Sequence, residues 1–472
     1  MTKKNFVHRP RLVIAGTASD VGKTTVTLGI MAAFTQMGLQ VQGFKVGPDY
    51  IDPGYHTVVT GRTSRNLDTW MMTASQMREV FLRNSESADL SIIEGVMGLY
   101  DGKEPTSNEG TTAEIAIVLD APVVLVLDVS SMARSAAAIV LGFMHMEPKL
   151  RLAGVIVNKV GSVGHYHLVK AAIEQLCAIP VLGYLLRDDA LHLEDRHLGL
   201  IPAFERPSMM VQIDTLVHRM NESIACDALL TLAKQAPALA ISPDNYHKVE
   251  AKDWTCTIAV AKDVAFHFYY EENFEWLTHF GAKLVFFSPL ANEPVPKEAD
   301  GIYLGGGFPE VFASKLSANE RTKQSLREAI EHKIPTYAEC GGYMYLFDAI
   351  VDQEGQAHPM VGVLHGKVTM QKQLAALGYR EVMAREDSML MNKGEIARGH
   401  EFHYSRVTLD NEIAWPFAYE AKGWRGEQQE GYAKDHLIAS YIHLHFSSNP
   451  TIAARFVASC LCYKDKKSVN PL

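Results

Sequence analysis

Residues 16–25 read Gly-Thr-Ala-Ser-Asp-Val-Gly-Lys-Thr-Thr and directly follow the apolar run 12–15. Glycines at such a turn let backbone N–H groups curl around phosphate groups at the positive end of the helix that follows. Lys23 can then reach the outer phosphates, and the hydroxyl of Thr24 can bind a magnesium ion. The stretch therefore predicts a phosphate-binding loop between the first strand and first helix of a parallel α/β sheet.

The pattern around this loop indicates two α/β domains. Short apolar runs alternate with helical stretches in the first half, a pattern typical of a parallel sheet. The expected strands are 12–15, 41–46, 90–93, 123–127, 155–157 and 181–185, then, in the second half, 257–261, 283–287, 301–304 and 335–338. Prolines and polar residues between the halves predict a linker. The expected divisions are a P-loop domain over 1–235, a linker over 236–253, a second α/β domain over 254–456, and a solvated tail over 457–472.

Composition limits the class of protein. The chain has 472 residues, of which 47% are hydrophobic and 21% charged, a balance typical of globular domains. Its formal charge of −9 argues against general nucleic-acid binding, which needs a basic surface. No apolar run is long enough to cross a membrane, residues 1–10 lack the apolar core of a secretory signal, and the six cysteines lack zinc-site spacing. We therefore expect a reduced, cytoplasmic protein with small-molecule partners, without nucleic acid or membrane.

The phosphate loop departs from the usual spacing, because Gly16 lies six residues before Gly22 and Thr17 replaces a glycine. In this respect it resembles the loop of dethiobiotin synthetase and its relatives. That resemblance implies ATP as a co-substrate and activation of a carboxylate as an acyl phosphate. The expected ATP-binding residues are Gly16, Thr17, Asp20, Val21, Gly22, Lys23, Thr24 and Thr25.

Acidic residues follow the next expected strands, where ligands of open α/β sheets bind. Glu94 ends one strand, Asp49 and Asp52 share a tight loop after another, and Asp101 closes the segment that follows Glu94. Hard oxygen ligands suit Mg²⁺, so Thr24, Asp49 and Glu94 are the expected metal ligands. Lys45, Asp49, Asp52 and Asp101 are the expected substrate-binding residues. Each acid could instead serve only as a turn or capping residue, and Lys45 could be a solvated lysine.

A second chemical pattern lies in the C-terminal half. Residues 338–342 read Ala-Glu-Cys-Gly-Gly between an expected strand and helix, so Cys340 sits on a nucleophile elbow, where a helix N-terminus would lower the pKa of its thiol. Such a cysteine needs a histidine base. The motif Ser-Tyr-Ile-His-Leu-His at 440–445 offers His443 and His445, of which we prefer His443. The glycine run 305–307 can bind an oxyanion through backbone N–H groups; Gly306, Gly307 and Gly341 are the expected donors.

The order of glycine loop, cysteine and histidine resembles the class I glutamine amidotransferases, which implies a glutaminase. Two positions differ. Ala338 replaces the first glycine of the elbow, and His445 stands where those enzymes carry an acid two residues after the histidine. The third member of the triad is therefore either absent or supplied differently.

Together the two patterns resemble the cobyrinic acid a,c-diamide synthases of corrin biosynthesis. The resemblance rests on residues 45–53, 94–101, 305–310, the cysteine elbow and the motif Gly-His-Glu-Phe-His-Tyr-Ser at 399–405. It implies amidation of the a- and c-acetate carboxylates of a corrin through acyl phosphates, with ATP, Mg²⁺ and glutamine. It leaves open the sister enzymes that act on hydrogenobyrinic acid or nickel-sirohydrochlorin. A different class, a P-loop partner ATPase with a degenerate glutaminase-like domain, is disfavoured because Cys340 and the glycines are present.

Overall fold

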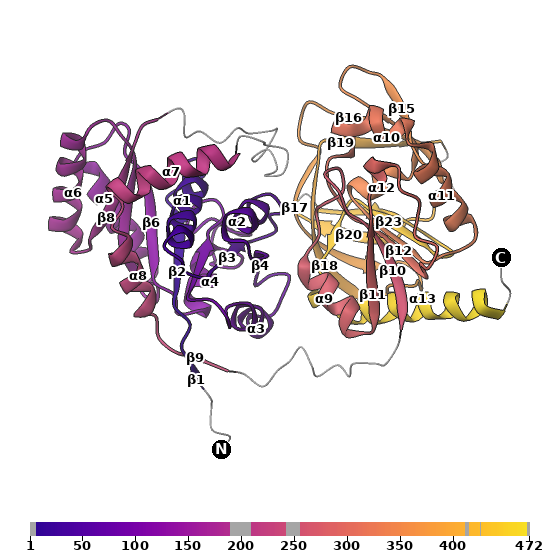
Figure 1. Cartoon of the computed structure of the whole chain (residues 1–472), viewed down its shortest axis with the longest axis horizontal. Helices are drawn as coiled ribbons and strands as arrows, with labels where there is room; N and C mark the ends of the chain where they lie inside the picture. The colour runs from indigo at the N-terminus through magenta and orange to yellow at the C-terminus, as the bar shows by residue number, and fades with distance from the viewer. Residues whose placement is uncertain (1–5, 189–208, 242–254, 411–414, 425, 470–472) are drawn as a thin grey trace. The chain divides into compact units, whose positions relative to one another are not determined.

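Seven parallel strands form the sheet of the N-terminal unit (Figure 1). Their order is β4 (Arg65–Leu67), β3 (Val41–Val46), β5 (Leu90–Glu94), β2 (Arg11–Gly16), β6 (Val123–Asp128), β7 (Leu152–Val160) and β8 (Val181–Leu186). Most of their residues are buried, as expected for apolar strands covered by helices on both faces. The α/β class predicted for this half is confirmed.

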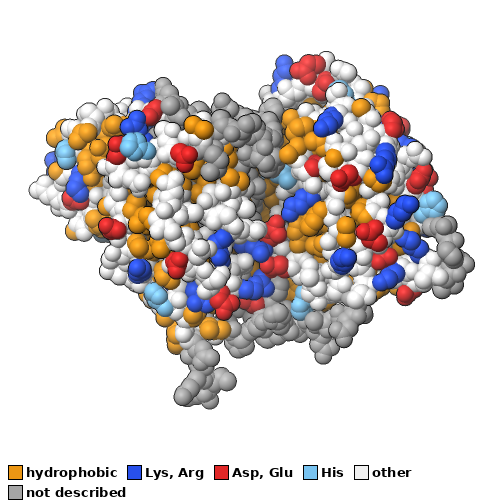
Figure 2. Space-filling model, viewed as in Figure 1, with side chains coloured by type: hydrophobic (Ala, Val, Ile, Leu, Met, Phe, Trp, Pro, Cys, Tyr) orange, Lys and Arg blue, Asp and Glu red, His pale blue; other side chains and the backbone are white. Residues whose placement is uncertain are grey.

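The computed structural model describes residues 6–188, 209–241, 255–410, 415–424 and 426–469. Contacts divide the chain into two units, 1–248 and 249–472. No helix in these described ranges is both long and apolar enough to span a bilayer. On the face shown in Figure 2, Lys and Arg side chains are interspersed with Asp and Glu.

Alternate side chains of the N-terminal strands pack in two separate hydrophobic cores. Ile156 of β7 packs in a cluster with α1 (Lys23–Gln36), α2 (Asp52–Thr60), α7 (Met209–Ser223) and α8 (Cys226–Lys234). Its neighbours Val155 and Val157 pack in another cluster with α5 (Ser135–Met146) and α6 (Val163–Cys177). Successive strand side chains point to opposite faces, so the two groups of helices sandwich the sheet. The unit also contains α3 (Ala74–Asn84) and α4 (Thr112–Val118).

The C-terminal unit is built around a six-stranded sheet. Its order is β11 (Ala282–Phe287), β10 (Cys256–Ala261), β12 (Gly301–Leu304), β13 (Thr336–Glu339), β23 (Leu437–Ser440) and β22 (Tyr432–Lys434). All neighbouring pairs are parallel except β22 with β23. The helices described in this unit are α9 (Glu271–His279), α10 (Ala313–Ala318), α11 (Glu320–Glu331), α12 (Gly341–Tyr345) and α13 (Thr451–Val469). The α/β class predicted for this half is confirmed as well.

Two further sheets in this unit were not predicted. One consists of β15 (Ala357–Pro359), β14 (Phe347–Val351), β16 (Leu364–Met370) and β19 (Ser405–Leu409). The other consists of β21 (Gly426–Glu430), β20 (Tyr419–Gly423), β17 (Ala376–Ala384), β18 (Ile396–His403) and β24 (His443–Leu444). The second sheet matters for function, because it joins the 399–405 motif to His443.

The expected tail is instead part of the fold. Residues 457–469 continue α13, and Val457 and Cys460 are fully buried on it. Lysines in the last turns mask the helical spacing of Ile452, Phe456 and Cys460, which is why the sequence suggested a solvated end. Within the expected linker, β9 (Leu239–Ala240) pairs with β1 (Phe6–Val7). Residues 242–253 of that linker and 470–472 of the tail lie outside the described ranges.

One buried arginine, Arg11, anchors the start of β2 through hydrogen bonds. The Nε atom of Arg11 donates to the carbonyl of Leu119 at 2.7 Å. Its terminal nitrogens donate to the carbonyls of Arg9, Asp120 and Pro237 at 2.8, 3.1 and 2.7 Å. Burial lowers the pKa of Arg11 to about 10, so the side chain stays charged at neutral pH. Four carbonyls therefore depend on a single guanidinium.

Replacing this arginine should destabilise the N-terminal unit. We expect Arg11→Met to lower the free energy of unfolding by about 3 kcal/mol, because one buried and three partly buried carbonyls lose their donor. Urea titration of the full chain measures the change. Arg151→Met is the matched control, since Arg151 makes a 3.4 Å contact with the carbonyl of Gln235 at the surface. Equal destabilisation by the two variants would contradict the role of Arg11.

Candidate active sites

The phosphate loop joins β2 to α1 at the middle of the N-terminal sheet. Gly22 adopts a φ of 88°, a left-handed conformation that glycine tolerates, and α1 begins at the next residue. Lys23 folds back over the loop, and its Nζ donates to the carbonyl of Ala18 at 3.0 Å. Burial, together with the ammonium of Lys45, lowers the pKa of Lys23 to about 8. The loop therefore presents a lysine whose full charge an arriving phosphate would favour.

The other residues expected to bind ATP surround this turn. Gly16 ends β2, Thr17 follows it, and the exposed Asp20 has a φ of 61°. Val21 is buried and packs against the helices of the same face, whereas Thr25 is half-buried in the first turn of α1. They lie on one continuous loop, so the structure keeps the expected set together.

Oxygen ligands converge beside the loop on the neighbouring strands. The hydroxyl of Thr24 donates to Oε1 of Glu94 at 2.6 Å and lies 3.4 Å from Oδ2 of Asp52. The Nζ atom of Lys45 contacts the same two oxygens, at 3.1 Å from Glu94 and 2.5 Å from Asp52. Lys45 and Glu94 are direct partners in the pairing of β3 with β5. The sheet register therefore assembles this cluster.

The charged groups of the cluster shift one another's pKa values. Burial opposes ionisation of Glu94, but the Lys45 ammonium and the hydrogen bond from His56 hold the pKa of Glu94 far below its usual range. Burial and the nearby Asp49 raise the pKa of Asp52 above its usual range, despite its contact with Lys45. Asp52, Asp49 and Glu94 raise the pKa of Lys45 in spite of its burial. A further cation at this point would favour the ionised form of Asp52.

The donor set suits magnesium bound together with a nucleotide. Among the described residues, no group of three or more His, Cys, Asp and Glu side chains is arranged as a complete metal site. Mg²⁺ usually binds one or two carboxylates and takes its other ligands from phosphates and water. Glu94, Thr24 and Asp52 provide oxygen atoms of this kind beside the phosphate loop.

Two of the expected acids lie at the edge of this cluster. Asp49 accepts hydrogen bonds from the backbone N–H groups of Ile51 and Asp52, at 2.8 and 3.1 Å, and its other oxygen is 3.8 Å from Lys45. The structure therefore brings Asp52, rather than Asp49, to Thr24. Asp101 is exposed and accepts from the N–H of Gly98 at 2.9 Å. It closes the turn of a loop that packs on the phosphate loop.

One histidine in this site was missed from the sequence. Nε2 of the fully buried His56 lies 2.7 Å from Oε2 of Glu94, and its Nδ1 lies 3.1 Å from the hydroxyl of Ser64. The histidine therefore holds the Glu94 oxygen that Thr24 and Lys45 leave open. Its position on the inner face of α2, one turn after Asp52, was the available signal.

Behind the loop, Asn158 and Lys159 brace the backbone. The amide of Asn158 donates to the carbonyl of Val21 at 2.9 Å, and Nζ of Lys159 donates to that of Asp20 at 3.0 Å. Lys159 also lies 2.8 Å from the carboxylate of Asp128. These contacts orient the loop that a nucleotide would occupy.

In the C-terminal unit, Cys340 sits on a strained turn between β13 and α12. Its φ and ψ are 46° and −104°, a conformation that a non-glycine residue rarely adopts. The turn is held by hydrogen bonds from the N–H of Cys340 to the carbonyl of Ser440 and from the N–H of Gly342 to that of Gly305, at 2.8 and 2.9 Å. The thiol donates to the carbonyl of Phe402 at 3.7 Å. The geometry is that of the expected nucleophile elbow.

His443, and not His445, meets the cysteine. A Cβ atom built on Gly306 would lie 2.2 Å from Cε1 and 2.9 Å from Nε2 of His443, and 3.3 Å from Cβ of Cys340. The His443 ring and Cys340 therefore both lie next to Gly306. His445 turns away, accepts from the N–H of Ser447 at 3.3 Å and packs its ring 4.6 Å from that of Tyr270.

The glycine run shapes the space beside the thiol. The N–H of Gly306 donates to the carbonyl of Phe268 at 3.3 Å, so this amide serves the backbone. Gly307 has a φ of 152°, and a Cβ atom on Gly341 would lie 3.0 Å from the nitrogen of Gly307. Gly307 and Gly341 therefore approach each other closely next to Cys340, where the amides of an oxyanion site would lie.

Burial favours the neutral forms of Cys340 and His443. It raises the pKa of the Cys340 thiol far above its ordinary value, and the Glu310 carboxylate adds to the effect. Burial and the neighbouring His400 and His403 lower the pKa of His443 to about 3. The sequence suggested that a helix terminus would lower the thiol pKa; α12 is only five residues long, and desolvation dominates.

The motif 399–405 lies directly against this site. His400 is the pairing partner of His443 across β18 and β24. Glu401 accepts from Nε of Arg380 at 2.6 Å and lies 2.9 Å from Nε2 of His403. The ring of His403 stacks on Tyr441 with centroids 3.7 Å apart. The motif therefore forms one wall of the cysteine site.

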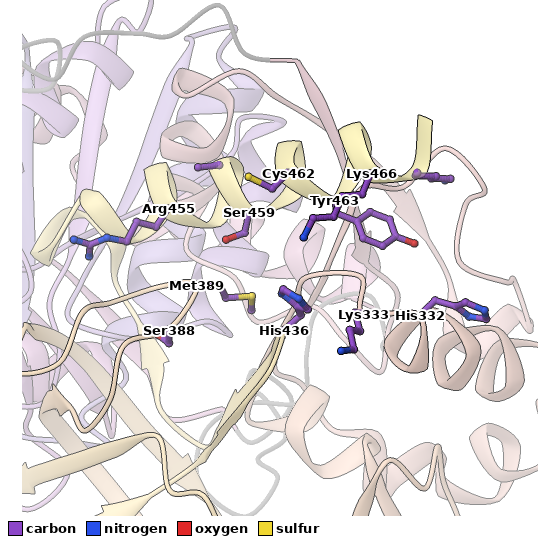
Figure 3. A pocket seen from close by; sticks show the side chains of 12 residues that line it. His332, Lys333, Ser388, Met389, His436, Arg455, Ser459, Cys462, Tyr463 and Lys466 are labelled. Carbon is purple, nitrogen blue, oxygen red and sulfur yellow. The ribbon is translucent and has the colours of Figure 1, made fainter. Parts of the chain in front are cut away.

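A cavity of about 490 Å³ in the same unit is a different place (Figure 3). His332, Lys333, His436 and residues of α13 line it, and none of the expected site residues does. Arg455 at its rim is bound to Glu395, with Nη2 2.8 Å from Oε1. The cavity therefore contributes no group to either site.

Comparisons with known proteins match the two halves separately. Residues 12–201 match the CobQ/CobB/MinD/ParA nucleotide binding domain, and residues 257–451 match the CobB/CobQ-like glutamine amidotransferase domain. A relative named cobyrinate a,c-diamide synthase from Priestia megaterium is 52% identical, over 97% of this chain and 98% of its own. Relatives of the same name from Picrophilus torridus and Dehalococcoides mccartyi are 44% and 43% identical, over 95% of this chain and 98% and 97% of theirs. With such similarity across both halves, the resemblance seen in the sequence is confirmed, and the chain belongs to the cobyrinate a,c-diamide synthase family.

Proposed function

We propose that this protein amidates the a- and c-acetate carboxylates of cobyrinic acid, with ATP and glutamine as co-substrates. The observation that carries the proposal is the presence in one chain of the Thr24–Glu94–Lys45 cluster at a phosphate loop and of Cys340 beside His443. The first arrangement suits phosphoryl transfer to a carboxylate, and the second suits release of ammonia from an amide. The names of the relatives supply the substrate.

In the cysteine site, the neutral His443 accepts the thiol proton while Sγ of Cys340 attacks the side-chain carbonyl of glutamine. The new C–S bond places negative charge on the carbonyl oxygen, which the amides of Gly307 and Gly341 stabilise. His443 then returns the proton to the departing nitrogen as the C–N bond breaks, giving ammonia and a thioester. Water, deprotonated by His443, cleaves the thioester to glutamate and restores the thiol.

In the P-loop site, a carboxylate oxygen of the corrin attacks the γ-phosphorus of ATP and ADP leaves. Ammonia then attacks the acyl carbon, a proton is lost, and phosphate departs to give the amide. Lys23 and the loop amides position the phosphates, and Lys45 neutralises the attacking carboxylate. A carboxylate alone is a poor acyl donor, so this order of steps is chemically required.

Thr24 and Glu94, with Asp52 beside them, would hold the magnesium ion of the ATP complex. Bound there, the ion would neutralise charge on the phosphate oxygens. His56 and Lys45 fix the two oxygens of Glu94, so the carboxylate needs little rearrangement. Asp49 and Asp101, farther from Thr24, remain candidates for contact with the corrin.

The nitrogen source should separate the two sites. Cys340→Ala should abolish glutamine hydrolysis and glutamine-dependent amidation but preserve amidation with ammonium salts, because the P-loop site is untouched. Cys462→Ala, which removes an exposed thiol, is the control and should retain both activities. Loss of ammonia-dependent amidation in Cys340→Ala would show that the two sites are not independent.

The product identifies the substrate. Mass spectrometry after incubation with cobyrinic acid, glutamine and ATP·Mg²⁺ should show two successive mass losses, each equal to exchange of a hydroxyl for an amino group. Omission of ATP should prevent both. Amidation of a metal-free or nickel macrocycle, with none of cobyrinic acid, would move the proposal to a sister substrate.

Glu94→Gln should lower ammonia-dependent amidation by roughly 100-fold or more, because the site loses the carboxylate that faces both Thr24 and Lys45. The rate is measured as ADP formed with saturating ammonia and corrin. Glu174→Gln is the control, since Glu174 pairs with Lys170 on a helix away from the loop and should change the rate little. Similar rates for Glu94→Gln and the wild type would exclude Glu94 from the site.

A further inference from the structure

A buried carboxylate lies beside the histidine of the cysteine site. Glu339 immediately precedes Cys340, is 1% exposed, and its Oε2 lies 3.9 Å from Nδ1 of His443. We propose that Glu339 is the positioning residue that orients His443, in place of the acid that would follow the histidine in the chain. The inference rests on the proposed glutaminase and names the group that completes it.

The tautomer of His443 explains why an acid is needed. The ring presents Nε2 and Cε1 to Gly306 and Cys340, whereas Nδ1 points to Glu339. A neutral imidazole carries one proton, and it can accept the thiol proton at Nε2 only if its own proton is on Nδ1. An acceptor near Nδ1 selects that tautomer and stabilises the imidazolium that forms during the reaction.

Glu339 is itself held rigidly. Its Oε2 accepts from the hydroxyl of Tyr303 at 2.7 Å, and its Oε1 accepts from the hydroxyl of Tyr337 and from the N–H of Leu444 at 2.9 Å. Leu444 follows His443 directly, so the carboxylate is anchored to the backbone of the histidine it faces. The 3.9 Å separation is longer than a hydrogen bond. Catalytic hydrogen bonds are often long in unliganded enzymes and tighten only in the substrate complex.

The other nearby groups are engaged elsewhere. His445 occupies the position of the usual acid, but it packs on Tyr270 and accepts from the N–H of Ser447. Glu401 is bound by Arg380 and His403, and Glu430 accepts from the N–H of Tyr441 at 2.7 Å. Glu339 is thus the carboxylate that the described residues place at Nδ1.

The groups around Glu339 and His443 affect the pKa values of both residues. Burial raises the pKa of Glu339 to about 7, whereas the hydrogen bonds from Tyr337, Tyr303 and Leu444 oppose that rise. The titratable groups that face Glu339 and His443 are Tyr269, Tyr303, Tyr337, Tyr419, Cys340, His400 and His403. Burial raises the pKa of each tyrosine and the thiol, so they remain protonated near neutrality. Burial thus places the pKa of Glu339 close to neutrality.

Glu339→Gln in the full chain tests the proposal. The amide can donate to Nδ1 and so favours the wrong tautomer. We expect kcat for glutamine hydrolysis to fall roughly 100-fold or more, with KM for glutamine nearly unchanged and ammonia-dependent amidation retained. In the wild type, kcat/KM should rise through pH about 7 as Glu339 loses its proton; this rise should be missing in Glu339→Gln.

Two further variants separate loss of the Glu339 carboxylate from a folding defect in Glu339→Gln. Glu339→Asp keeps the charge at a longer distance and should recover part of the lost kcat together with the pH-dependent rise. Glu430→Gln removes a carboxylate that is also buried, with a pKa raised to about 8 by burial and Glu401, and should leave kcat within about 3-fold of wild type.

The outcomes distinguish the role of Glu339 from the proposed glutaminase activity on which it rests. Wild-type kcat in Glu339→Gln, or equal losses in Glu339→Gln and Glu430→Gln, would overturn the role of Glu339 and leave the glutaminase intact. If Glu339→Gln does not fold, failure of Glu339→Asp to restore the pH-dependent rise would overturn it. Absence of Cys340-dependent glutamine hydrolysis in the wild type would instead overturn the proposed function.

Discussion

One buried lysine ammonium organises the N-terminal site. Lys45 lies within 4 Å of Asp49, Asp52 and Glu94, and its side chain and that of Glu94 are almost inaccessible to water. Burying a carboxylate without a partner costs several kcal/mol, and the Lys45 ammonium offsets much of that cost for the acids that gather at the end of β3 and β5. The Lys23 ammonium of the phosphate loop interacts with Glu94 and Asp52 as well, so the loop and the acidic residues form one electrostatic unit.

The two sites treat charge in opposite ways. At the phosphate loop, Lys45, Glu94 and Thr24 form charged and polar contacts before any substrate arrives. At the cysteine, burial keeps Cys340 and His443 neutral. A phosphoryl transfer needs charge held in place throughout, whereas a thiol attack needs a proton to move when the amide is present. A resting thiol that is protonated is also less reactive toward other electrophiles than a thiolate.

Much of this could be read from the sequence, because the chemistry lies in short contiguous motifs. The phosphate loop, Glu94 at a strand end and the Cys340 elbow each depend on local spacing, and the two α/β sheets followed from apolar runs. His56 and Glu339 could not be predicted in this way. The contact of His56 with Glu94 depends on how α2 packs on β3, the neighbour of β5. The contact of Glu339 with His443 joins residues more than a hundred positions apart. The 399–405 motif was recognised by resemblance, but its pairing partner β24 is only two residues long and gives no strand pattern in the sequence.

The place of Glu339 has a mechanical consequence. When the acid follows the histidine in the chain, those two residues move together and the nucleophile moves separately. Here the acid and the nucleophile are consecutive residues at the end of β13, and the N–H of Leu444 ties that acid to the strand of the histidine. Any shift of the strained elbow must therefore change the thiol and the Nδ1 contact at the same time. Because the elbow carries both Cys340 and Glu339, a displacement of the elbow would move the thiol and the carboxylate beside His443 together.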